Sequence, residues 1–335
     1  MLIIPSSLLM ITTMVVSTMM AILSSNWFLA WIAMEINLIS FIPLMNMTKS
    51  NQEAEASVKY FLAQAIGSAL MLLSSMSLWS MPSMNTLWPL LLIMSMLIKL
   101  GAAPLHFWYP SVMTSLSWSG ALLLTTWQKL APLALLSYAA WPQPSNSHIL
   151  AMCAALNAMI GGILGMNQSH IRTLLAYSSI THMGWMMGAL LVMTPHLTMT
   201  YFSLYVVIVS PMFILLNSLS VNTSAQVMKM TSLSLASSSM LILLLLSLGG
   251  LPPLTGFLPK WLLIMALMSS NSLTIIPLLL GSYMNLYFYL NLAFNMITTS
   301  TTPTVHPQKP NNSLLLALPG TSLLGLIMVA TYAMT

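Results

Sequence analysis

The architecture of this chain follows from one interruption, Gly249-Gly250-Leu251-Pro252-Pro253-Leu254-Thr255-Gly256-Phe257-Leu258-Pro259-Lys260-Trp261, in the middle of its longest apolar segment, residues 236–268. A membrane-spanning helix needs only about 20 residues, so this segment is too long for one straight span. The glycines and prolines predict a helix that breaks at mid-depth, where protein or water must satisfy the free backbone groups. Breaks of this kind commonly form ion sites. Lys260 is therefore a candidate site residue, although an interfacial lysine at a helix end is the alternative.

The composition indicates a membrane protein. Of the 335 residues, 58% are hydrophobic and only 3% are charged, and the mean hydropathy is +0.90. Soluble domains carry about 25% charged residues, so we expect an all-α, polytopic membrane protein. The net charge of +5 reflects a scarcity of acids and does not indicate a nucleic-acid partner. The single cysteine, Cys153, is expected to be a small buried apolar side chain.

Eleven membrane spans are expected from the apolar runs between polar breaks. The runs lie near residues 3–22, 27–45, 57–80, 85–104, 120–140, 148–166, 172–192, 197–218, 236–268, 273–296 and 313–333. The ninth run contains the interruption described above. The fourth run ends in a similar one, Gly101-Ala102-Ala103-Pro104, directly after Lys99.

The loop charges support this count. All five basic residues assigned to loops fall in even-numbered loops: Lys49, Lys59, Arg172, Lys229 and Lys309. Basic loops gather on one side of a membrane. The N-terminus is therefore expected on the side of these loops and the C-terminus on the opposite side.

Glu35 and Lys99 are charged residues inside the second and fourth runs. A charge near the bilayer centre costs about 2.5–3.5 kcal/mol, so such residues usually face a water path or a partner. We expect these two to interact with each other and to belong to an ion path. A buried ion pair with a purely structural role is the alternative, although such a pair is a poor source of stability.

Lys129 lies near the middle of the fifth run without an acid on its own helix. Burial disfavours a charged ammonium, so this lysine could take up and release a proton near neutral pH. The alternative is a side chain that extends to the membrane interface. His182 lies in the middle of the seventh run, where an imidazole could relay a proton between lysines. A hydrogen-bonded core histidine is nearly as plausible, and the other histidines, His106 among them, are assigned no role.

Several other site types are excluded by spacing. A haem site needs facing histidines at the right depth, and only one histidine is deep. The glycines at 161, 162 and 165 lack the strand and the acid of a dinucleotide fingerprint. Gly161 with Gly165, and Gly184 with Gly188, instead predict close helix contacts.

A polar stripe recurs at four-residue spacing along the tenth run: Tyr283, Tyr287, Asn291 and Asn295. Such a stripe either flanks water or forms hydrogen bonds between helices, and the second interpretation is favoured.

Five segments resemble the family of NADH dehydrogenase subunit 2, the antiporter-like membrane subunits of mitochondrial respiratory complex I. They occur in the family's order over essentially the whole chain, as Trp31–Leu44, Lys59–Gln64, Lys99–Trp108, Trp127–Pro132 and Gly249–Trp261. The resemblance implies an antiporter-like fold with two inverted repeats, whose discontinuous helices are the fourth and ninth spans. It also implies the loss of three N-terminal helices from a fourteen-helix ancestor, which leaves eleven.

The repeat boundaries follow from the same resemblance. Within a single membrane domain, 1–335, a remnant of the first repeat is expected at about 1–140 and the second repeat at about 148–296. A C-terminal helix is expected at 313–333.

The resemblance implies a role for each candidate residue. Glu35 and Lys99 match the family's interacting pair, Lys129 its central lysine and Lys260 the lysine of the second broken helix, with His182 as the relay. Proton translocation would then proceed through electrostatic coupling along this chain of groups. No cofactor is expected in this chain; NADH, FMN, iron–sulfur clusters and ubiquinone are expected in other subunits.

The resemblance also implies a location and partners. The chain is expected in the mitochondrial inner membrane, with its N-terminus and basic loops on the matrix side. Its partners would be lipids, protons and other membrane-arm subunits of complex I, including neighbouring antiporter-like subunits. Two alternatives stay open: a stand-alone cation/proton antiporter of the same fold, and a structural membrane subunit without a proton path.

Overall fold

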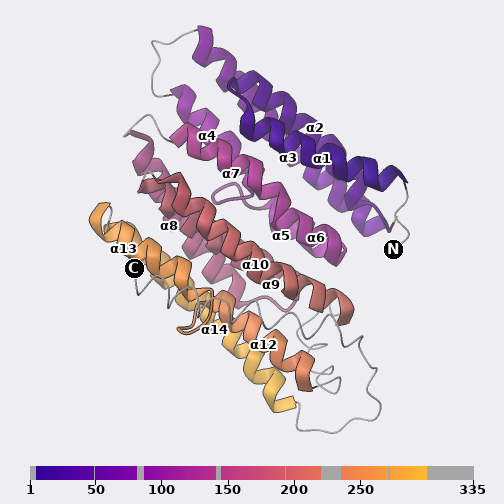
Figure 1. Ribbon diagram of the computed structural model, residues 1–335, viewed down its shortest axis with the longest axis vertical. Helices are drawn as coiled ribbons and strands as arrows, with labels where there is room; N and C mark the ends of the chain where they lie inside the picture. Colours follow the sequence, from indigo (N-terminus) through magenta and orange to yellow (C-terminus); the bar gives the residue numbers. More distant parts are fainter. Residues whose placement is uncertain are drawn as a thin grey trace. The chain divides into compact units, whose positions relative to one another are not determined.

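The computed structural model describes residues 5–48, 50–80, 87–140, 145–192, 194–219, 235–270 and 272–299 (Figure 1). All regular elements in these ranges are helices, which confirms the all-α prediction. Six of them are long and apolar enough to cross a membrane on their own. The predicted C-terminal helix at 313–333 and the loop residues Lys49, Lys229 and Lys309 lie outside the described ranges, so the count of eleven spans stays a prediction.

The chain divides into two compact units, Met1–Leu150 and Ala151–Thr335. The helices of the first unit are α1 (Pro5–Leu23), α2 (Trp27–Met45), α3 (Asn51–Ser80), α4 (Leu87–Leu100), α5 (Trp108–Ser115), α6 (Trp118–Thr125) and α7 (Trp127–Ala140). Within this unit α2 packs between α1 and α3, while α4 packs between α3 and α7. The helix that carries Lys99 therefore packs against the helix that carries Lys129.

The second unit contains most of α8 (Ser145–Met166), then α9 (Ile171–Leu191), α10 (Pro195–Leu219), α12 (Leu235–Gly249), α13 (Phe257–Ser270), the short 3-10 helix η2 (Ser272–Thr274) and α14 (Ile275–Thr299). α9 contacts α10, α13 and α14, and it is buried along nearly its whole length. This central position explains why His182, in the middle of α9, is buried.

Both predicted interruptions break their helices. α4 ends at Leu100 and is followed by Gly101 with φ +66°, and α12 ends at Gly249 and is followed by Gly250 with φ +83°. Only glycine adopts this left-handed conformation without strain. The glycine in each motif therefore ends the first half-helix.

Two features of the first unit were not predicted. Residues 108–115, which lie between the fourth and fifth predicted spans, form the short helix α5. Eight residues are too few to cross a membrane. The fifth run is also interrupted at Thr126, between α6 and α7. Pro132 lies in the second turn of α7, and it cannot donate a backbone hydrogen bond to the carbonyl of Gln128.

The assignment of Lys59 to a loop was wrong. α3 begins at Asn51, so Lys59 lies inside that helix. The early start has a clear cause: the Ser50 hydroxyl accepts a 3.2 Å hydrogen bond from the Glu53 backbone N–H, and the Glu53 carboxylate accepts one of 2.9 Å from the Thr48 N–H. Together these bonds satisfy amide groups at the helix start.

Glycines bring the helices of the second unit into close contact. A Cβ atom at Gly161 would lie 2.7 Å from the Tyr177 carbonyl oxygen on α9, and one at Gly184 would lie 2.8 Å from the Ala154 carbonyl oxygen on α8. This confirms the predicted close contacts. Gly281 on α14 approaches the Ala158 carbonyl of α8 in the same way.

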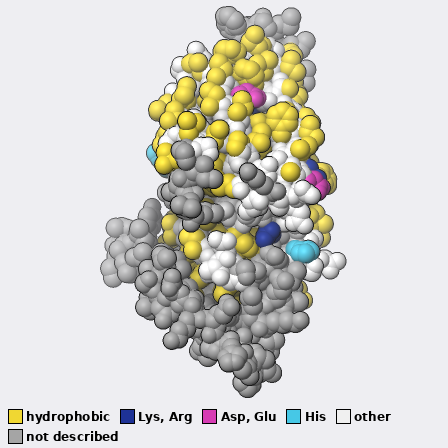
Figure 2. All heavy atoms as spheres, turned by 90° about the vertical axis from the view of Figure 1, so that its right-hand side faces the viewer, with side chains coloured by type: hydrophobic (Ala, Val, Ile, Leu, Met, Phe, Trp, Pro, Cys, Tyr) yellow, Lys and Arg dark blue, Asp and Glu magenta, His cyan; other side chains and the backbone are white. Residues whose placement is uncertain are grey.

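Large apolar side chains remain exposed on the outer helix faces, for example Leu23, Ile39 and Leu62. Figure 2 shows hydrophobic side chains over most of the described part of one face, with very few charged groups among them. Such a surface is typical of a protein that faces lipid or neighbouring subunits.

Candidate functional site

Four of the five predicted site residues are buried. In the first unit these are Lys99 and Lys129, whereas Glu35 is half-buried; in the second unit they are His182 and Lys260. Buried ionisable groups in a membrane domain are costly, so each must be stabilised by its surroundings. The two units are therefore considered separately.

Lys99 lies in the last turn of α4, where the negative end of the helix dipole favours a cation. The carbonyl groups freed by the break are satisfied by side chains. Gln64 donates a 3.2 Å hydrogen bond to the Lys99 carbonyl oxygen, and Trp108 Nε1 donates one of 3.0 Å to the Ile98 carbonyl oxygen. The Lys99 side chain lies against Gly67 of α3, where a Cβ would be only 3.1 Å from Lys99 Cγ. The break is thus fixed by α3 and α5 together.

Glu35 interacts electrostatically with Lys99, but the two side chains form no direct ion pair. The other two acids of the chain have structural roles: Glu53 caps α3, and Glu55 forms an exposed ion pair with Lys59 at 2.6 Å. Glu35 is therefore the acid placed to act on Lys99. Their pairing stays a prediction.

Lys129 lies in the first turn of α7, and its ammonium nitrogen is 4.7 Å from the centroid of the Tyr109 ring on α5. The preceding residue, Gln128, donates a 3.0 Å hydrogen bond to the side-chain oxygen of Asn37 on α2. Tyr60 of α3 donates one of 3.4 Å to the Gln128 side-chain oxygen. The Lys129 side chain is buried within the first unit, which favours the proposed inward position over an extended one.

Sequence reasoning passed over Tyr109, which contacts Lys129, and over the bridge formed by Asn37, Tyr60 and Gln128. The segments that carry the family resemblance include Asn37, Tyr60 and Gln128. These residues are polar but uncharged, whereas the candidate site residues were chosen for their ionisable side chains. A buried amide two residues from Glu35, and another next to Lys129, were the available signals.

Lys260 lies in the first turn of α13, and its ammonium donates a 2.8 Å hydrogen bond to the Gly249 carbonyl oxygen at the end of α12. The carbonyl end of a helix carries partial negative charge, so this contact stabilises the cation. Gly250 leaves the room for it, because a Cβ at this position would lie 2.7 Å from Lys260 Nζ. The Lys260 side chain therefore contacts the backbone at the predicted break between α12 and α13.

His182 forms a 2.9 Å hydrogen bond between its Nδ1 and the Tyr201 hydroxyl on α10. Its ring centroid is 5.1 Å from that of Tyr205. These contacts fit the hydrogen-bonded core histidine as well as a relay, so both interpretations remain.

The tyrosines of the polar stripe on α14 lie on its exposed face. Tyr283 and Tyr287 are 65% and 62% exposed, and Asn295 donates a hydrogen bond to Asn291 on the same helix. The inward polar residues of α14 are instead Asn285, which donates a hydrogen bond to the Thr181 hydroxyl on α9, and Tyr289.

His106 was assigned no role but is buried in the loop between α4 and α5. Its ring stacks on Phe107 with centroids 4.5 Å apart, and its Nδ1 has no hydrogen-bond partner in the described part of the chain. Its position two residues after the predicted break at residues 101–104 was the available signal for its burial.

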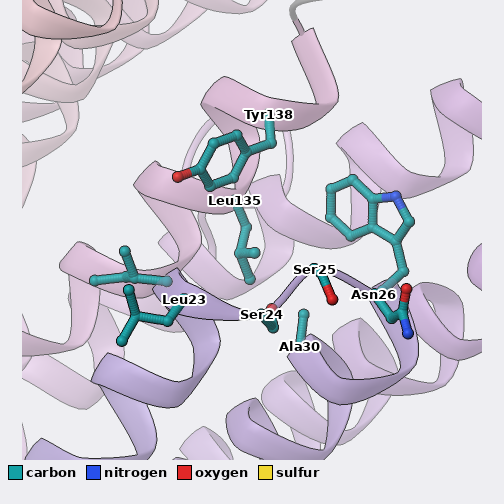
Figure 3. Close-up of a pocket in the computed structure, with 9 residues that line it drawn as sticks. Leu23, Ser24, Ser25, Asn26, Ala30, Leu135 and Tyr138 are labelled. Atoms are coloured by element: carbon teal, nitrogen blue, oxygen red, sulfur yellow. The ribbon is translucent and has the colours of Figure 1, made fainter.

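A pocket of about 500 Å³ lies at the turn between α1 and α2, beside the C-terminal part of α7 (Figure 3). Ser24, Ser25 and Asn26 form its polar side, while Leu135 and Tyr138 of α7 face it. Its lining contains none of the predicted site residues and no charged side chain. Among the described residues, no cluster of His, Cys, Asp or Glu could hold a metal ion.

Comparison with known proteins agrees with the fold. Residues 24–285 match a family model described as "NADH:quinone oxidoreductase/Mrp antiporter, TM". The chain is 48% identical over 289 residues to NADH-ubiquinone oxidoreductase chain 2 of Lumbricus terrestris, with 86% of each chain covered. It is 39% identical over 299 residues to the chain 2 of Xenopus laevis, covering 87% of this chain and 86% of the relative.

Solved structures show the same architecture. A chain of respiratory complex I from Thermus thermophilus superimposes with a TM-score of 0.82 at 25% identity, covering 96% of this chain and 78% of that one. A chain of the Mrp complex from Dietzia superimposes with a TM-score of 0.73 at 14% identity, covering 91% of this chain and 62% of that one. These similarities confirm the antiporter-like fold.

Proposed function

The chain belongs to the NADH-ubiquinone oxidoreductase chain 2 family, the proton-translocating membrane-arm subunits of respiratory complex I, and from this premise we propose that its buried lysines carry the protons. Lys99, Lys129 and Lys260 are the proposed carriers. Glu35 acts on Lys99, and His182 is the proposed relay.

One observation carries this proposal: three lysines are buried in an apolar helical domain, and each has its own local support. Lys99 lies at a helix C-terminus, Lys129 on an aromatic ring and Lys260 on a backbone carbonyl. An unsupported charge in the bilayer costs about 2.5–3.5 kcal/mol. A buried lysine adds little to the stability of a fold, but it can take up and release a proton. A role as a titrating group therefore accounts better for these three lysines.

The proposed mechanism is electrostatic. Two unit charges 7–10 Å apart in a medium with an effective dielectric constant near 20 interact with about 2 kcal/mol. This corresponds to more than a tenfold change in proton affinity. Loading or unloading one group therefore changes the proton affinity of the next, and a sequence of such changes could move a proton across the membrane.

The assembly and location follow as further parts of the proposal. Other membrane-arm subunits of complex I, including antiporter-like ones, are the proposed neighbours, and NADH, FMN, iron–sulfur clusters and ubiquinone act in other subunits. The mitochondrial inner membrane is the proposed location, with the N-terminus on the matrix side. The similarity to complex I chains over most of their length favours this subunit role over a stand-alone antiporter.

The test replaces Lys129 by Met in the assembled complex. Methionine keeps the length and apolar stem but removes the titratable charge, so assembly should persist. Protons pumped per NADH should fall, and NADH–ubiquinone turnover should slow because a blocked step holds back the coupled reaction. Lys129→Arg should not restore pumping, since a guanidinium stays protonated. Normal turnover with an unchanged proton-to-electron ratio in the Met variant would assign Lys129 a structural role.

A further inference from the structure

The Tyr109 ring lies against the ammonium of Lys129. The distance from Lys129 Nζ to the ring centroid is 4.7 Å, within the range of about 6 Å in which a cation and a ring face attract each other. Both side chains are buried. The attraction is strongest at such desolvated sites, where it is worth several times its value on a surface.

The first break fixes the position of this ring. Tyr109 is the second residue of α5, and its backbone N–H donates a 3.0 Å hydrogen bond to the His106 carbonyl oxygen in the loop. The ring packs edge-on against Trp108. Its base fills the space beside Gly101, where an added Cβ would lie 2.8 Å from Tyr109 Cβ. The ring therefore cannot shift away from Lys129 without moving the break.

The Tyr109 ring is the contact that supports the charge of the Lys129 ammonium. Within the described part of the chain it donates no hydrogen bond, whereas the Lys260 ammonium donates one to the Gly249 carbonyl oxygen. The ring face is the electron-rich group that Lys129 touches. A ring attracts the charged ammonium but not the neutral amine, so it acts on only one of the two protonation states.

We propose that Tyr109 is a positioning residue of the proton path, whose ring face holds Lys129 in its protonated form inside the membrane. This inference rests on the proposed role of Lys129 as a proton carrier. The first break would then serve both lysines of this unit. It ends α4 beside Lys99, and it positions the Tyr109 ring that raises the proton affinity of Lys129.

Other titratable groups around Lys129 bear on the same equilibrium. Of the helices packed on α7, α4 carries Lys99 and α1 and α6 carry no ionisable side chain. α2 carries Glu35, α3 reaches Gln128 through Tyr60, and Tyr138 lies on α7 itself. The Tyr109 variants below leave all of these in place.

The experiment compares Tyr109→Met with Tyr109→Phe in the assembled complex, reconstituted in vesicles. Methionine fills the space with a flexible apolar side chain and removes the ring face, whereas phenylalanine keeps the face and removes only the hydroxyl. Protons pumped per NADH are measured between pH 6 and 9, with Lys129→Met as the reference for loss of the carrier. Tyr109→Leu is measured in parallel, so the comparison can use whichever apolar variant assembles.

The Met variant should lose about tenfold in proton affinity, so the alkaline limit of pumping should move about one pH unit lower. The Phe variant should follow the wild type. A Met variant that superimposes on the wild type, while Lys129→Met abolishes pumping, would refute the role of Tyr109 and leave the proposed function intact. An equal shift in the Phe and Met variants would also refute it, since the ring face would then be irrelevant. Undiminished pumping in Lys129→Met would overturn both.

Discussion

The side chain of Gln128 donates a 3.0 Å hydrogen bond to the side-chain oxygen of Asn37, which joins the helix of Lys129 to the helix of Glu35. Both amides are buried. Tyr60 on α3 adds a third helix to this bridge through its hydroxyl. The bridge therefore ties α2, α3 and α7 together through buried side chains.

Replacing Gln128 by Leu should destabilise the subunit by about 1–3 kcal/mol, because it leaves the Asn37 amide buried without its partner. The double variant with Asn37→Leu should cost less than the sum of the two single variants. The thermal stability of the assembled complex measures this. Gln168→Leu is the matched control, since its amide follows α8 near the surface and donates a hydrogen bond to the Leu164 carbonyl of that helix. Strictly additive costs would show that the two amides are not coupled.

Gly250→Ala should impair pumping although it changes no ionisable residue. The left-handed backbone at Gly250 strains any other residue by about 1–3 kcal/mol, and the added methyl group would collide with the Lys260 ammonium. Gly249→Ala is the control, because its nearest atoms would be 3.7 Å away. The proton-to-electron ratio of the two variants is the measurement, and equal ratios would contradict the expectation.

Gly161→Ala should reduce assembly of the subunit. Its methyl group would lie 2.5 Å from Thr181 Cγ2 and 2.7 Å from the Tyr177 carbonyl, so α8 and α9 would have to separate. Gly120→Ala meets only ordinary contacts of 3.5 Å or more and should assemble normally. The amount of assembled complex on a native gel distinguishes the two; a normal amount for both would mean that the helices can adjust.

Lys99→Ala should impair both NADH–ubiquinone turnover and proton transfer, because it removes a proposed proton carrier and the group on which Glu35 acts. Lys59→Ala provides the comparison: its ion pair with Glu55 is exposed, and such pairs contribute about 0–1 kcal/mol. Wild-type pumping in an assembled Lys99→Ala complex would show that the pairing is not required.

The fold class and both helix breaks could be predicted from the sequence, because glycine and proline in an apolar run allow few alternatives. The short helix α5 and the interruption at Thr126 could not. The break at Thr126 has no glycine or proline beside it, and α5 is only eight residues long, so tertiary packing defines both. The length rule for membrane spans applies to helices of about 20 residues, so it does not predict an eight-residue helix such as α5.

The inward faces of the helices were the least predictable feature. In water, an apolar stripe marks the buried side of a helix, but a helix in lipid is apolar all round. The regular spacing of Tyr283 and Tyr287 therefore drew attention to the exposed face of α14, while Asn285 and Tyr289 face inward. Charged residues gave a better guide, since their cost in the membrane leaves few places for them.

The contact between Lys260 and the Gly249 carbonyl has a consequence for reading natural sequence variants. A substitution at Gly250 would mimic the loss of a lysine in a biochemical assay, while the lysine itself remained intact. A survey that ranked variants only by changes in charge would pass it over. Variants of small neutral residues that contact these lysines should therefore be ranked together with variants of the lysines themselves.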